Sequence, residues 1–421
     1  MTAPKRGIKS AEIVTIGNEL TTGMVADTNS RFIATYLLNR GYAVARIVSV
    51  PDNRAAIIGE LRGALRRAAL VVVTGGLGPT HDDITKEALC GLFKCKTRFN
   101  PTVLRQVQRH FKKAGKPMPE SNRSYADIPT AAEPVENRVG TAPGLFFGKK
   151  ILAMPGVPLE AQRMLLTAGP RLIPHGGAHL CETTLHTARI GEVGLSGKMR
   201  GLEKAVALAD VAFLPAHGRV DVRIIARAAN PEKARQKLKA AEKLIRKDIE
   251  PHIWGTDGDS IETVVSRLLA KHALTLCVAE SCTGGAIGKK ITAVPGSSGY
   301  FMGGIIAYSN AAKEKLIGVP KKTLARHGAV SAETAAAMAK GARKRFGVDF
   351  AISATGIAGP GGGTPQKPVG LTFIGLSTPA GEIVRRLDLP ADRATNREWA
   401  AFEALHFLYE NLRPKTIPDN G

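Results

Sequence analysis

The sequence contains few cysteines, few aromatic residues and no long apolar run, and each shortage excludes a class of protein. Its five cysteines are odd in number and none are in CxxC spacing, so neither a disulfide framework nor a zinc site is predicted. No stretch of about 18 apolar residues occurs, and no apolar core follows the first charges, so neither a membrane span nor a signal peptide is expected. We therefore expect a soluble, cytoplasmic protein with no membrane partner.

The composition is that of a globular protein with an excess of positive charge. The 421 residues exceed one typical domain of roughly 100 to 200 residues, so two or three domains are expected. Only 5% of the residues are aromatic, whereas 45 are glycine and 25 are proline, a balance typical of turn-rich α/β folds. The formal net charge of +23 favours partners that carry phosphate.

Much of this charge lies in helical surface runs such as residues 233–247, KARQKLKAAEKLIRK. Lysine and arginine alternate there with leucine, isoleucine and alanine at helical spacing, and no aromatic residues are interleaved for base stacking. We interpret the run as a solvated helix face, and we do not expect nucleic acid as a partner.

Strand-like and helix-like segments alternate from Ala11 to about Ala168. EIVTIG, YAVARIVSV and ALVVVTGG are typical of strands, and the segments between them, NSRFIATYLLNRG and AAIIGELRGALRRA, are typical of helices. This order predicts a parallel sheet with helices on both faces. Glycines follow the strands at Gly17, Gly75 and Gly76, at the carboxyl ends where such sheets bind ligands.

The pattern changes near residue 171 and again near residue 256. The middle segment reads as a small α+β module, and its GEVG stretch (Gly191 to Gly194) matches the GXXG loop of KH-type RNA binders. A second α/β pattern follows, in which Asp259 or Ser260 caps the first helix. Helices are predicted at 260–271, 283–293, 331–346 and 394–412, and strands at 274–279, 303–308, 349–354 and twice across 369–388. The predicted domains are 8–170, 171–255 and 256–414.

The stretch AESCTGG, Ala279 to Gly285, lies where a strand is followed by a helix. Ser281 and Cys282 are expected among the unpaired N–H groups at the helix N-terminus, a location that stabilises negative charge. That charge could be a bound phosphate or an oxyanion formed when a side chain attacks a carbonyl. The alternative is that Ser281 only caps the helix.

A nucleophilic serine needs a base, and no histidine lies near AESCTGG or in the segment that follows. AYSNAAK, Ala307 to Lys313, ends a predicted strand with Tyr308 and places Lys313 in the next turn or helix, so that both could approach Ser281. Lysine has an ordinary pKa of about 10.4, so Lys313 must be desolvated to act as a base. The alternative is a surface lysine beside a tyrosine at a strand end.

The segment Ala354 to Gly370, ATGIAGPGGGTPQKPVG, follows the apolar strand DFAIS and is rich in glycine and proline. Such a loop is suited to close contact between backbone and ligand. Thr355 is placed to hydrogen-bond the group that Ser281 attacks. Arg393 and Arg397, one helical turn apart, are suited to a phosphate.

AESCTGG, AYSNAAK, TGIAGPGGGT and KPVG, in this order between about Ser260 and Leu412, resemble the carboxyl-terminal domain of the competence/damage-inducible protein A (CinA) family. The resemblance implies hydrolysis of the carboxamide of nicotinamide mononucleotide, with Ser281, Tyr308 and Lys313 as catalytic residues and no cofactor. Cys282 is the rival nucleophile, because a helix N-terminus also lowers the pKa of a thiol. The expected substrate-binding residues are Thr283, Gly284, Gly285, Thr355, Gly356, Arg393 and Arg397.

Two loops of the first domain, TIGNELTTGMVADTNS (15–30) and VTGGLGPTHDDITKEAL (73–89), carry its candidate site. The second follows a β-branched run and opens a helix, so its glycines can bind phosphate through backbone amides. Asp82 and Asp83 are expected in the first helical turn, where they could complement the helix dipole or, with acidic residues of the first loop, hold a divalent metal. The expected phosphate-binding residues are Gly75, Gly76, Gly78 and Thr80, and the expected metal-binding or catalytic residues are Glu19, Asp27, Asp82 and Asp83.

These two loops, with NRVGTAPG and MPGVPLE, are similar to the molybdopterin-binding-like domain of the same family, although GNELTTG lacks the family's double leucine. The resemblance implies a three-layer domain, a KH-like module and an α/β amidase domain in a homodimer. It also implies an ADP-ribose pyrophosphatase that uses a divalent metal (Mg, Mn or Co), and a place in pyridine-nucleotide salvage. The alternatives are a domain that binds molybdopterin or a nucleotide without turnover, and a nucleic-acid factor of competence.

Overall fold

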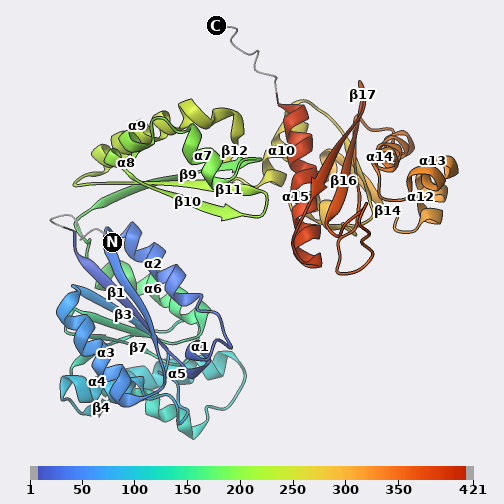
Figure 1. Cartoon of the computed structure of the whole chain (residues 1–421). Coiled ribbons are helices and arrows are strands. Elements are labelled where there is room, and N and C mark those ends of the chain that lie inside the picture. Colours follow the sequence, from blue (N-terminus) through green and yellow to red (C-terminus); the bar gives the residue numbers. More distant parts are fainter. Residues whose placement is uncertain (1–7, 414–421) are drawn as a thin grey trace. The chain divides into compact units, whose positions relative to one another are not determined.

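The structure, a computed structural model, describes residues 8–413 and divides into two compact units. The first comprises Met1–Cys181 and Ala226–Leu238, and the second comprises Glu182–Ile225 and Lys239–Gly421. The described residues form four sheets, of six, four, five and two strands, and the two units are described separately (Figure 1). Among the described residues, no helix has the length and apolar character needed to cross a membrane.

The first unit is built on a six-stranded mixed sheet in the order β2-β1-β3-β8-β7-β6. Its strands are β1 (Ser10–Ile16), β2 (Ala43–Val50), β3 (Leu70–Thr74), β6 (Ala132–Val135), β7 (Gly144–Phe147) and β8 (Ile151–Met154). The four strands from β2 to β8 are parallel, as predicted, but β7 and β6 are antiparallel. The predicted parallel sheet thus holds for these four strands and not for β7 and β6; β7 and β8 are antiparallel because the turn at 148–150 is too short for the crossover that parallel strands need.

Helices cover both faces of this sheet, as the alternating pattern predicted. Along β1, Ile13 packs with α2 (Asn29–Asn39) and α6 (Pro158–Leu172), whereas the next residue, Val14, packs with α3 (Arg54–Arg67) and α4 (Thr85–Phe93). Successive side chains of a strand point to opposite faces, so one strand contributes to two cores. Around the sheet lie α1 (Asn18–Thr21), β4 (Thr97–Phe99), α5 (Pro101–Lys113), the 3-10 helix η1 (Glu120–Ala126) and β5 (Asp127–Pro129).

The middle of the chain forms a four-stranded sheet in the order β10-β11-β9-β12, with helices. It comprises β9 (His179–Ala188), α7 (Glu192–Lys198), α8 (Leu202–Leu208), β10 (Asp210–Ala216), β11 (Arg219–Ala228), α9 (Pro231–Ile249), η2 (Glu250–His252) and β12 (Ile253–Thr256). The α+β character is the one predicted. Gly191, the first residue of GEVG, is the N-cap of α7.

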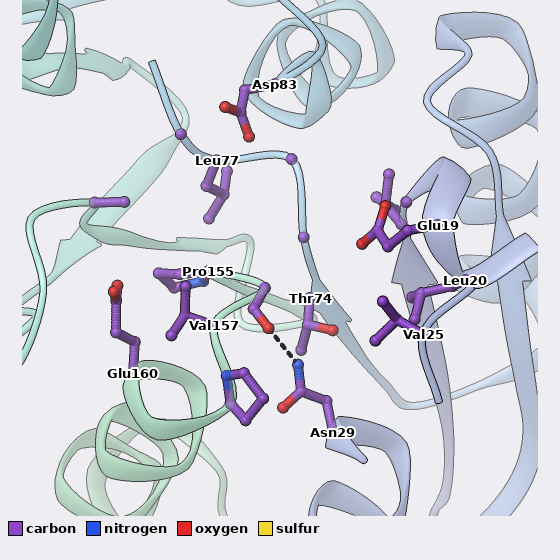
Figure 2. Close-up of a pocket in the computed structure, with 18 of the residues that line it drawn as sticks. Glu19, Leu20, Val25, Asn29, Thr74, Leu77, Asp83, Pro155, Val157 and Glu160 are labelled. Atoms are coloured by element: carbon purple, nitrogen blue, oxygen red, sulfur yellow. Dashed lines mark hydrogen bonds between the residues drawn. The ribbon is translucent and has the colours of Figure 1, made fainter. Parts of the chain in front are cut away.

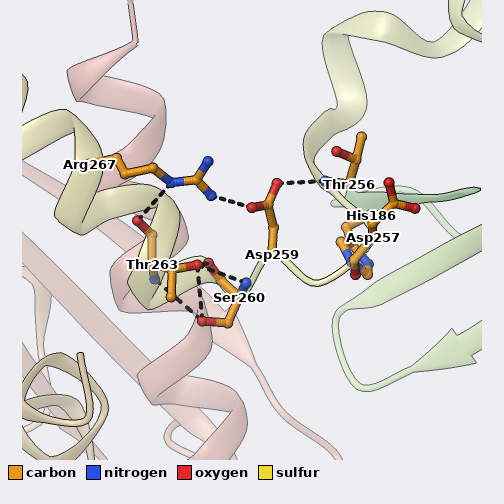
Figure 3. A network of polar contacts seen from close by, with 7 residues as sticks. All are labelled: His186, Thr256, Asp257, Asp259, Ser260, Thr263 and Arg267. Carbon is orange, nitrogen blue, oxygen red and sulfur yellow. Dashed lines mark hydrogen bonds and ion pairs between the residues drawn. The ribbon is translucent and has the colours of Figure 1, made fainter. Parts of the chain in front are cut away.

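A polar network connects the end of β12 to α10 (Ile261–Lys271), the first helix of the carboxyl-terminal domain (Figure 3). The Asp259 carboxylate accepts hydrogen bonds from the Thr256 amide and from the Arg267 guanidinium. Ser260 is the N-cap, and its side chain and that of Thr263 form a capping box. The capping prediction is thereby confirmed for Ser260, while Asp259 holds the turn before it.

The carboxyl-terminal domain has a five-stranded sheet in the order β14-β13-β15-β16-β17. The strands are β13 (Leu276–Glu280), β14 (Phe301–Ile306), β15 (Phe350–Gly356), β16 (Leu371–Thr378) and β17 (Gly381–Asp388). The first three are parallel, and β16 and β17 add an antiparallel hairpin. The carboxyl ends of β13, β14 and β15 therefore share one edge, where ligands bind in such sheets.

Two helical layers enclose this sheet. The helices α10, α11 (Ala286–Thr292) and α15 (Arg393–Leu412) contribute to the core on one face, and α12 (Asn310–Ile317), α13 (Lys321–His327) and α14 (Ala332–Phe346) to the core on the other. A short 3-10 helix, η3 (Ser297–Gly299), precedes β14. Every helix and strand predicted in this domain is present, with ends shifted by at most three residues.

Candidate active sites

The carboxyl-end edge of the second sheet brings Ser281 and Lys313 together. Ser281 follows β13, and Lys313 is on α12, which follows β14. Lys313 Nζ lies 3.0 Å from Ser281 Oγ, 2.9 Å from the Ala307 carbonyl oxygen and 2.9 Å from the Tyr308 carbonyl oxygen. The serine and the lysine that the sequence analysis paired are thus in hydrogen-bond contact.

Lys313 is 1% exposed and is among the largest fully buried side chains of the described residues. Burial lowers the pKa of its amine, because the charged form loses its hydration. The neutral amine has two hydrogens and one lone pair. In the structure Lys313 Nζ donates to Ser281 Oγ and to both carbonyl oxygens. When the amine is neutral, the two carbonyls can keep its two hydrogens, and its lone pair can accept the proton of Ser281 Oγ. The surroundings therefore satisfy the form of lysine that acts as a base.

The predicted placement of Ser281 at a helix N-terminus was wrong. Helix α11 begins only at Ala286, and the buried carboxylate of Glu280 caps it. Glu280 accepts hydrogen bonds from the backbone N–H groups of Gly285 (2.8 Å), Ile287 (3.2 Å) and Gly288 (2.8 Å). Sequence analysis missed this role of Glu280, because a glutamate next to a serine gives no sign that it binds amides five to eight residues later.

Other backbone N–H groups remain beside Ser281. Among the described residues, no oxygen accepts a hydrogen bond from the amides of Cys282 and Thr283, whereas the Gly284 amide donates to the Ser281 carbonyl. Gly284 and Gly285 have left-handed backbone conformations, with φ of 57° and 98°, which glycine adopts without strain. The turn from 281 to 285 thus leaves the amides of Cys282 and Thr283 without an oxygen acceptor, with the Cys282 thiol as their neighbour.

Cys282 is poorly suited to be the nucleophile. It is buried, and burial raises the pKa of its thiol to about 12, against the smaller lowering effect of the adjacent amides. The thiol therefore stays protonated near neutral pH, and the thiolate is the reactive form. This disfavours the rival assignment that the sequence left open.

Tyr308 contacts Lys313 through its backbone and not through its ring. Its side chain is 60% exposed, and its hydroxyl oxygen accepts a hydrogen bond from Arg393 Nη2 at 3.2 Å. The strand that was predicted to end at Tyr308 ends at Ile306. The structure thus shows the carbonyl of Tyr308 on the lysine, and its phenol beside Arg393.

The two arginines that were predicted to bind phosphate, Arg393 and Arg397, have different hydrogen-bond partners. Arg397 donates to the Thr283 carbonyl oxygen from Nε (3.2 Å) and Nη2 (3.0 Å), so it braces the turn that holds Ser281. Arg393 donates to the Gly359 carbonyl oxygen at 2.8 Å and to Tyr308, and remains exposed. Arg393 is therefore the better placed of the two to meet a phosphate.

Of three further predicted residues of this site, Thr355 and Gly356 are engaged within the protein and Thr283 is not. Thr355 is buried, and its hydroxyl donates to the Ala329 carbonyl oxygen at 2.7 Å. A Cβ at Gly356 would lie 2.5 Å from Thr372 Oγ1, so the glycine permits contact with the neighbouring strand. Thr283 is fully buried, and its hydroxyl has no hydrogen-bond partner among the described residues. Of the three, only Thr283 has an unused polar atom beside Ser281.

The first unit contains a cleft of about 440 Å³ at the carboxyl ends of β1 and β3. The two predicted loops line it together with the turn that precedes α6. Figure 2 shows Glu19, Asp83 and Glu160 on different sides of this cleft. Asn29 of the first predicted loop and Glu160 of MPGVPLE also line the cleft, although neither was named as a site residue, and Asp52 and Tyr125 lie outside every predicted motif.

The glycine turn after β3 fits the prediction of a phosphate-binding loop in part. Gly75 has a φ of 103°, and a Cβ there would lie 2.0 Å from the Ile16 carbonyl oxygen, so only glycine fits. Among the described residues, the backbone N–H groups of Gly76, Leu77 and Gly78 have no partner. These three amides line the cleft and are available to an anion.

Asp82 and Asp83 do not lie in the first helical turn, because α4 begins at Thr85. Both carboxylates accept a hydrogen bond from the Thr80 hydroxyl, and Asp83 also accepts from the Thr80 amide at 3.0 Å. Thr80, predicted to bind phosphate, is thus engaged by two carboxylates of its own loop. Because residues 80–83 precede the helix, the Asp83 side chain can accept a hydrogen bond from the Thr80 amide.

The predicted metal ligands share the cleft, but they are not arranged as a metal site. Within residues 8–413, no group of three or more His, Cys, Asp or Glu side chains could hold a metal ion. The Asp27 carboxylate accepts hydrogen bonds from the Ser30 amide (2.9 Å) and the Ser30 hydroxyl (2.5 Å). Burial raises the pKa of Asp52, and the nearby charges of Glu19, Asp82 and Asp83 raise it further. The residues present thus concentrate negative charge without forming a coordination shell.

Comparison with protein families assigns each segment. Residues 12–174 match the model described as "Probable molybdopterin binding domain", residues 182–255 the "Damage-inducible protein CinA KH domain" and residues 258–412 the "CinA C-terminal domain". The chain thus combines a molybdopterin-binding-like domain, a KH-like module and a CinA carboxyl-terminal domain, in the order that was predicted.

Similarity to known proteins extends over almost the whole chain. A "CinA-like protein" of Kosmotoga olearia is 40% identical over 408 residues, 96% of this chain and 99% of the relative. Another, of Chloroherpeton thalassium, is 39% identical over 417 residues, 96% of this chain and 99% of the relative. The chain therefore belongs to the competence/damage-inducible protein CinA family.

Among solved structures, the competence/damage inducible protein CihA from Agrobacterium tumefaciens is 38% identical. It covers 36% of this chain and 94% of its own, with a TM-score of 0.35. The protein CinA from Thermoplasma acidophilum is 36% identical and covers 40% of this chain and 99% of its own, with a TM-score of 0.37.

Proposed function

We propose that the carboxyl-terminal domain hydrolyses the carboxamide of nicotinamide mononucleotide to nicotinate mononucleotide and ammonia. The observation that carries this proposal is the buried contact of 3.0 Å between Lys313 Nζ and Ser281 Oγ. A serine beside a desolvated lysine suits acyl transfer without histidine or metal. The substrate comes from the family resemblance, and the exposed Arg393 at the mouth of the site is compatible with its phosphate.

The reaction would begin when Lys313 accepts the proton of Ser281 Oγ and the oxygen attacks the amide carbon. The amides of Cys282 and Thr283 are the candidate donors to the resulting oxyanion. The C–N bond then breaks, and the proton on Lys313 leaves with the nitrogen as ammonia. Water attacks the serine ester, Lys313 accepts a proton from that water, and the acid is released as Oγ regains its proton.

The direct test is ammonia release from nicotinamide mononucleotide by the full-length protein and by Ser281→Ala. We expect release by the first and a loss of at least about 10³-fold in the second, because the nucleophile is removed. A probe that acylates the active nucleophile should modify Ser281, as mapped by mass spectrometry. Labelling of Cys282 instead would refute the assignment, and equal ammonia release by both proteins would refute the site.

We propose further that the cleft of the first unit cleaves ADP-ribose to AMP and ribose 5-phosphate. The free amides of Gly76, Leu77 and Gly78 support binding of a phosphate at the end of β3. No step is assigned to a metal, because the carboxylates do not form a coordination shell. The alternative of binding without turnover is distinguished by AMP release.

The matching experiment measures AMP release from ADP-ribose with and without added Mg²⁺, Mn²⁺ or Co²⁺. Gly76→Ala is the informative variant, because a Cβ there would lie 2.3 Å from Thr85 Oγ1 and the φ of 63° disfavours alanine. We expect it to lose AMP release while ammonia release from nicotinamide mononucleotide is unchanged. Binding of ADP-ribose without AMP formation by the unmodified protein would show a binding module.

A further inference from the structure

A strongly basic segment of the first unit lies outside both proposed sites. Residues 94–123 contain nine lysines and arginines and a single acidic residue, Glu120. All nine cations are exposed, and none of them lines the 440 Å³ cleft. They are Lys94, Lys96, Arg98, Arg105, Arg109, Lys112, Lys113, Lys116 and Arg123. We call this segment the basic surface.

The helix α5 displays four of these cations on one face. At 3.6 residues per turn, Arg105, Arg109, Lys112 and Lys113 fall within an arc of about 100°. The residues buried in the core, Val103 and Val107, lie on the opposite side of the helix. The α5 cations therefore form a continuous stripe that faces solvent.

The cations of this surface have no ion-pair partner among the described residues, although Glu87 and Asp127 line a hollow together with Lys96. Among residues 8–413, no acidic side chain forms an ion pair with any of the nine cations, in contrast to cations elsewhere, such as Arg67, which pairs with Glu12 at 2.8 Å. A hollow of about 350 Å³ adjoins the stripe and is lined in part by Arg109 and Lys113. Its acidic member, Glu136, pairs with Arg138 at 3.2 Å.

An aromatic ring lies within the basic surface. Phe99, on β4 immediately before α5, is 44% exposed, which is unusual for phenylalanine. The guanidinium of Arg123 on η1 lies 5.6 Å from the centroid of its ring. A cation paired with an exposed ring is a combination on which a nucleic-acid base stacks. The sequence analysis did not expect nucleic acid as a partner because the basic run 233–247 has no aromatic residue. Residues 94–123 differ from that run in having an exposed aromatic ring.

We propose that the basic surface binds single-stranded nucleic acid, with phosphates on the α5 stripe and a base against Phe99 and Arg123. Electrostatics alone would suit any polyanion, but the exposed ring favours unpaired bases. A membrane is disfavoured, because the α5 stripe presents no apolar side chain to solvent. The site is independent of both proposed activities, because none of its residues is assigned to them.

The test is fluorescence anisotropy of a labelled oligothymidylate of about 20 nucleotides, longer than typical single-strand sites, with the full-length protein. The key variant combines Arg105→Gln, Arg109→Gln and Lys112→Gln. The matched control removes the same charge from α9 by Lys239→Gln, Lys243→Gln and Lys247→Gln. We expect the α5 variant to weaken binding at least about tenfold and the α9 control to change it less than about twofold. The salt dependence should also fall, because each lost phosphate contact reduces the log–log slope by about 0.7 for single strands.

Phe99→Leu separates stacking from charge. It keeps an apolar side chain on β4 and all nine cations, and we expect it to weaken binding by about tenfold, within the range measured for one stacked base. Ammonia release from nicotinamide mononucleotide should be unchanged in every variant, and thermal unfolding of the full-length protein, which should also be unchanged, serves as the test that the first unit is folded.

Equal losses in the α5 and α9 variants would overturn the proposal, because net charge alone would then explain binding. Equal affinity for polyglutamate or for duplex DNA of the same length would also overturn it, as would anionic vesicles that compete with the oligonucleotide as well as an unlabelled strand does. Unchanged binding by Phe99→Leu would refute the stacking role.

Discussion

Replacing Lys313 by methionine should abolish the amidase while leaving the fold intact. Methionine has a similar length and no amine, so Ser281 would lose its base. Loss of a general base costs about 10² to 10⁴ in rate, and we expect kcat/KM to fall about 10³-fold, or about 4 kcal/mol of transition-state stabilisation. Ammonia release from nicotinamide mononucleotide measures this loss.

The effect on stability should be much smaller, because two contributions oppose each other. The Ala307 and Tyr308 carbonyls lose their donor, at about 1 to 3 kcal/mol for each buried group left unpaired. The variant also no longer buries an amine, and that burial is unfavourable enough to lower the pKa of Lys313. We therefore expect the thermal midpoint to shift by only a few degrees.

The pH profile gives an independent measure. Burial lowers the pKa of Lys313, so the neutral amine becomes populated as pH rises through that lowered value. Log kcat/KM of the unmodified protein should rise with a slope of about one below this pKa and level off above it. The rising limb should be absent from the residual activity of Lys313→Met.

The matched control is Lys315→Met, which changes an exposed lysine of the same helix and should retain full activity. The reasoning would be refuted if Lys313→Met kept more than about a tenth of the rate. A rising limb that persisted in the variant would equally show that another group is the base.

Two further predictions concern the turn around Ser281. Cys282→Ala should keep ammonia release within about threefold, because burial raises the pKa of this thiol to about 12 and leaves little thiolate; a fall comparable to that of Ser281→Ala would reinstate the cysteine as nucleophile. Glu280→Gln should destabilise the domain by about 3 kcal/mol and slow ammonia release, because an amide nitrogen would replace one of the oxygens that accept the three N–H groups at the start of α11. Thermal unfolding measures the loss of stability, and initial rates measure the loss of activity. An unchanged thermal midpoint would show that the Glu280 cap contributes nothing to stability.

The order of helices and strands could be predicted from the sequence because it depends on local patterns. Runs such as LVVVT of β3 and the periodicity of NSRFIATYLLN in α2 identified their elements, and the glycines identified the turns at the strand ends. The residue types of AESCTGG and AYSNAAK made Ser281 and Lys313 candidates, and the family resemblance that these motifs carry paired them. These features involve neighbours in the chain, or motifs whose residue types are themselves informative.

The tertiary structure decided which groups can react, because burial and hydrogen bonding depend on residues far apart in sequence. Lys313 is a base candidate because the sheet and α12 remove its amine from water beside Ser281, 32 residues away. Arg397 braces the carbonyl of Thr283, 114 residues earlier, which no local pattern predicts. Likewise, only the folded chain shows that Glu280 caps α11 and that Cys282 is too buried to ionise.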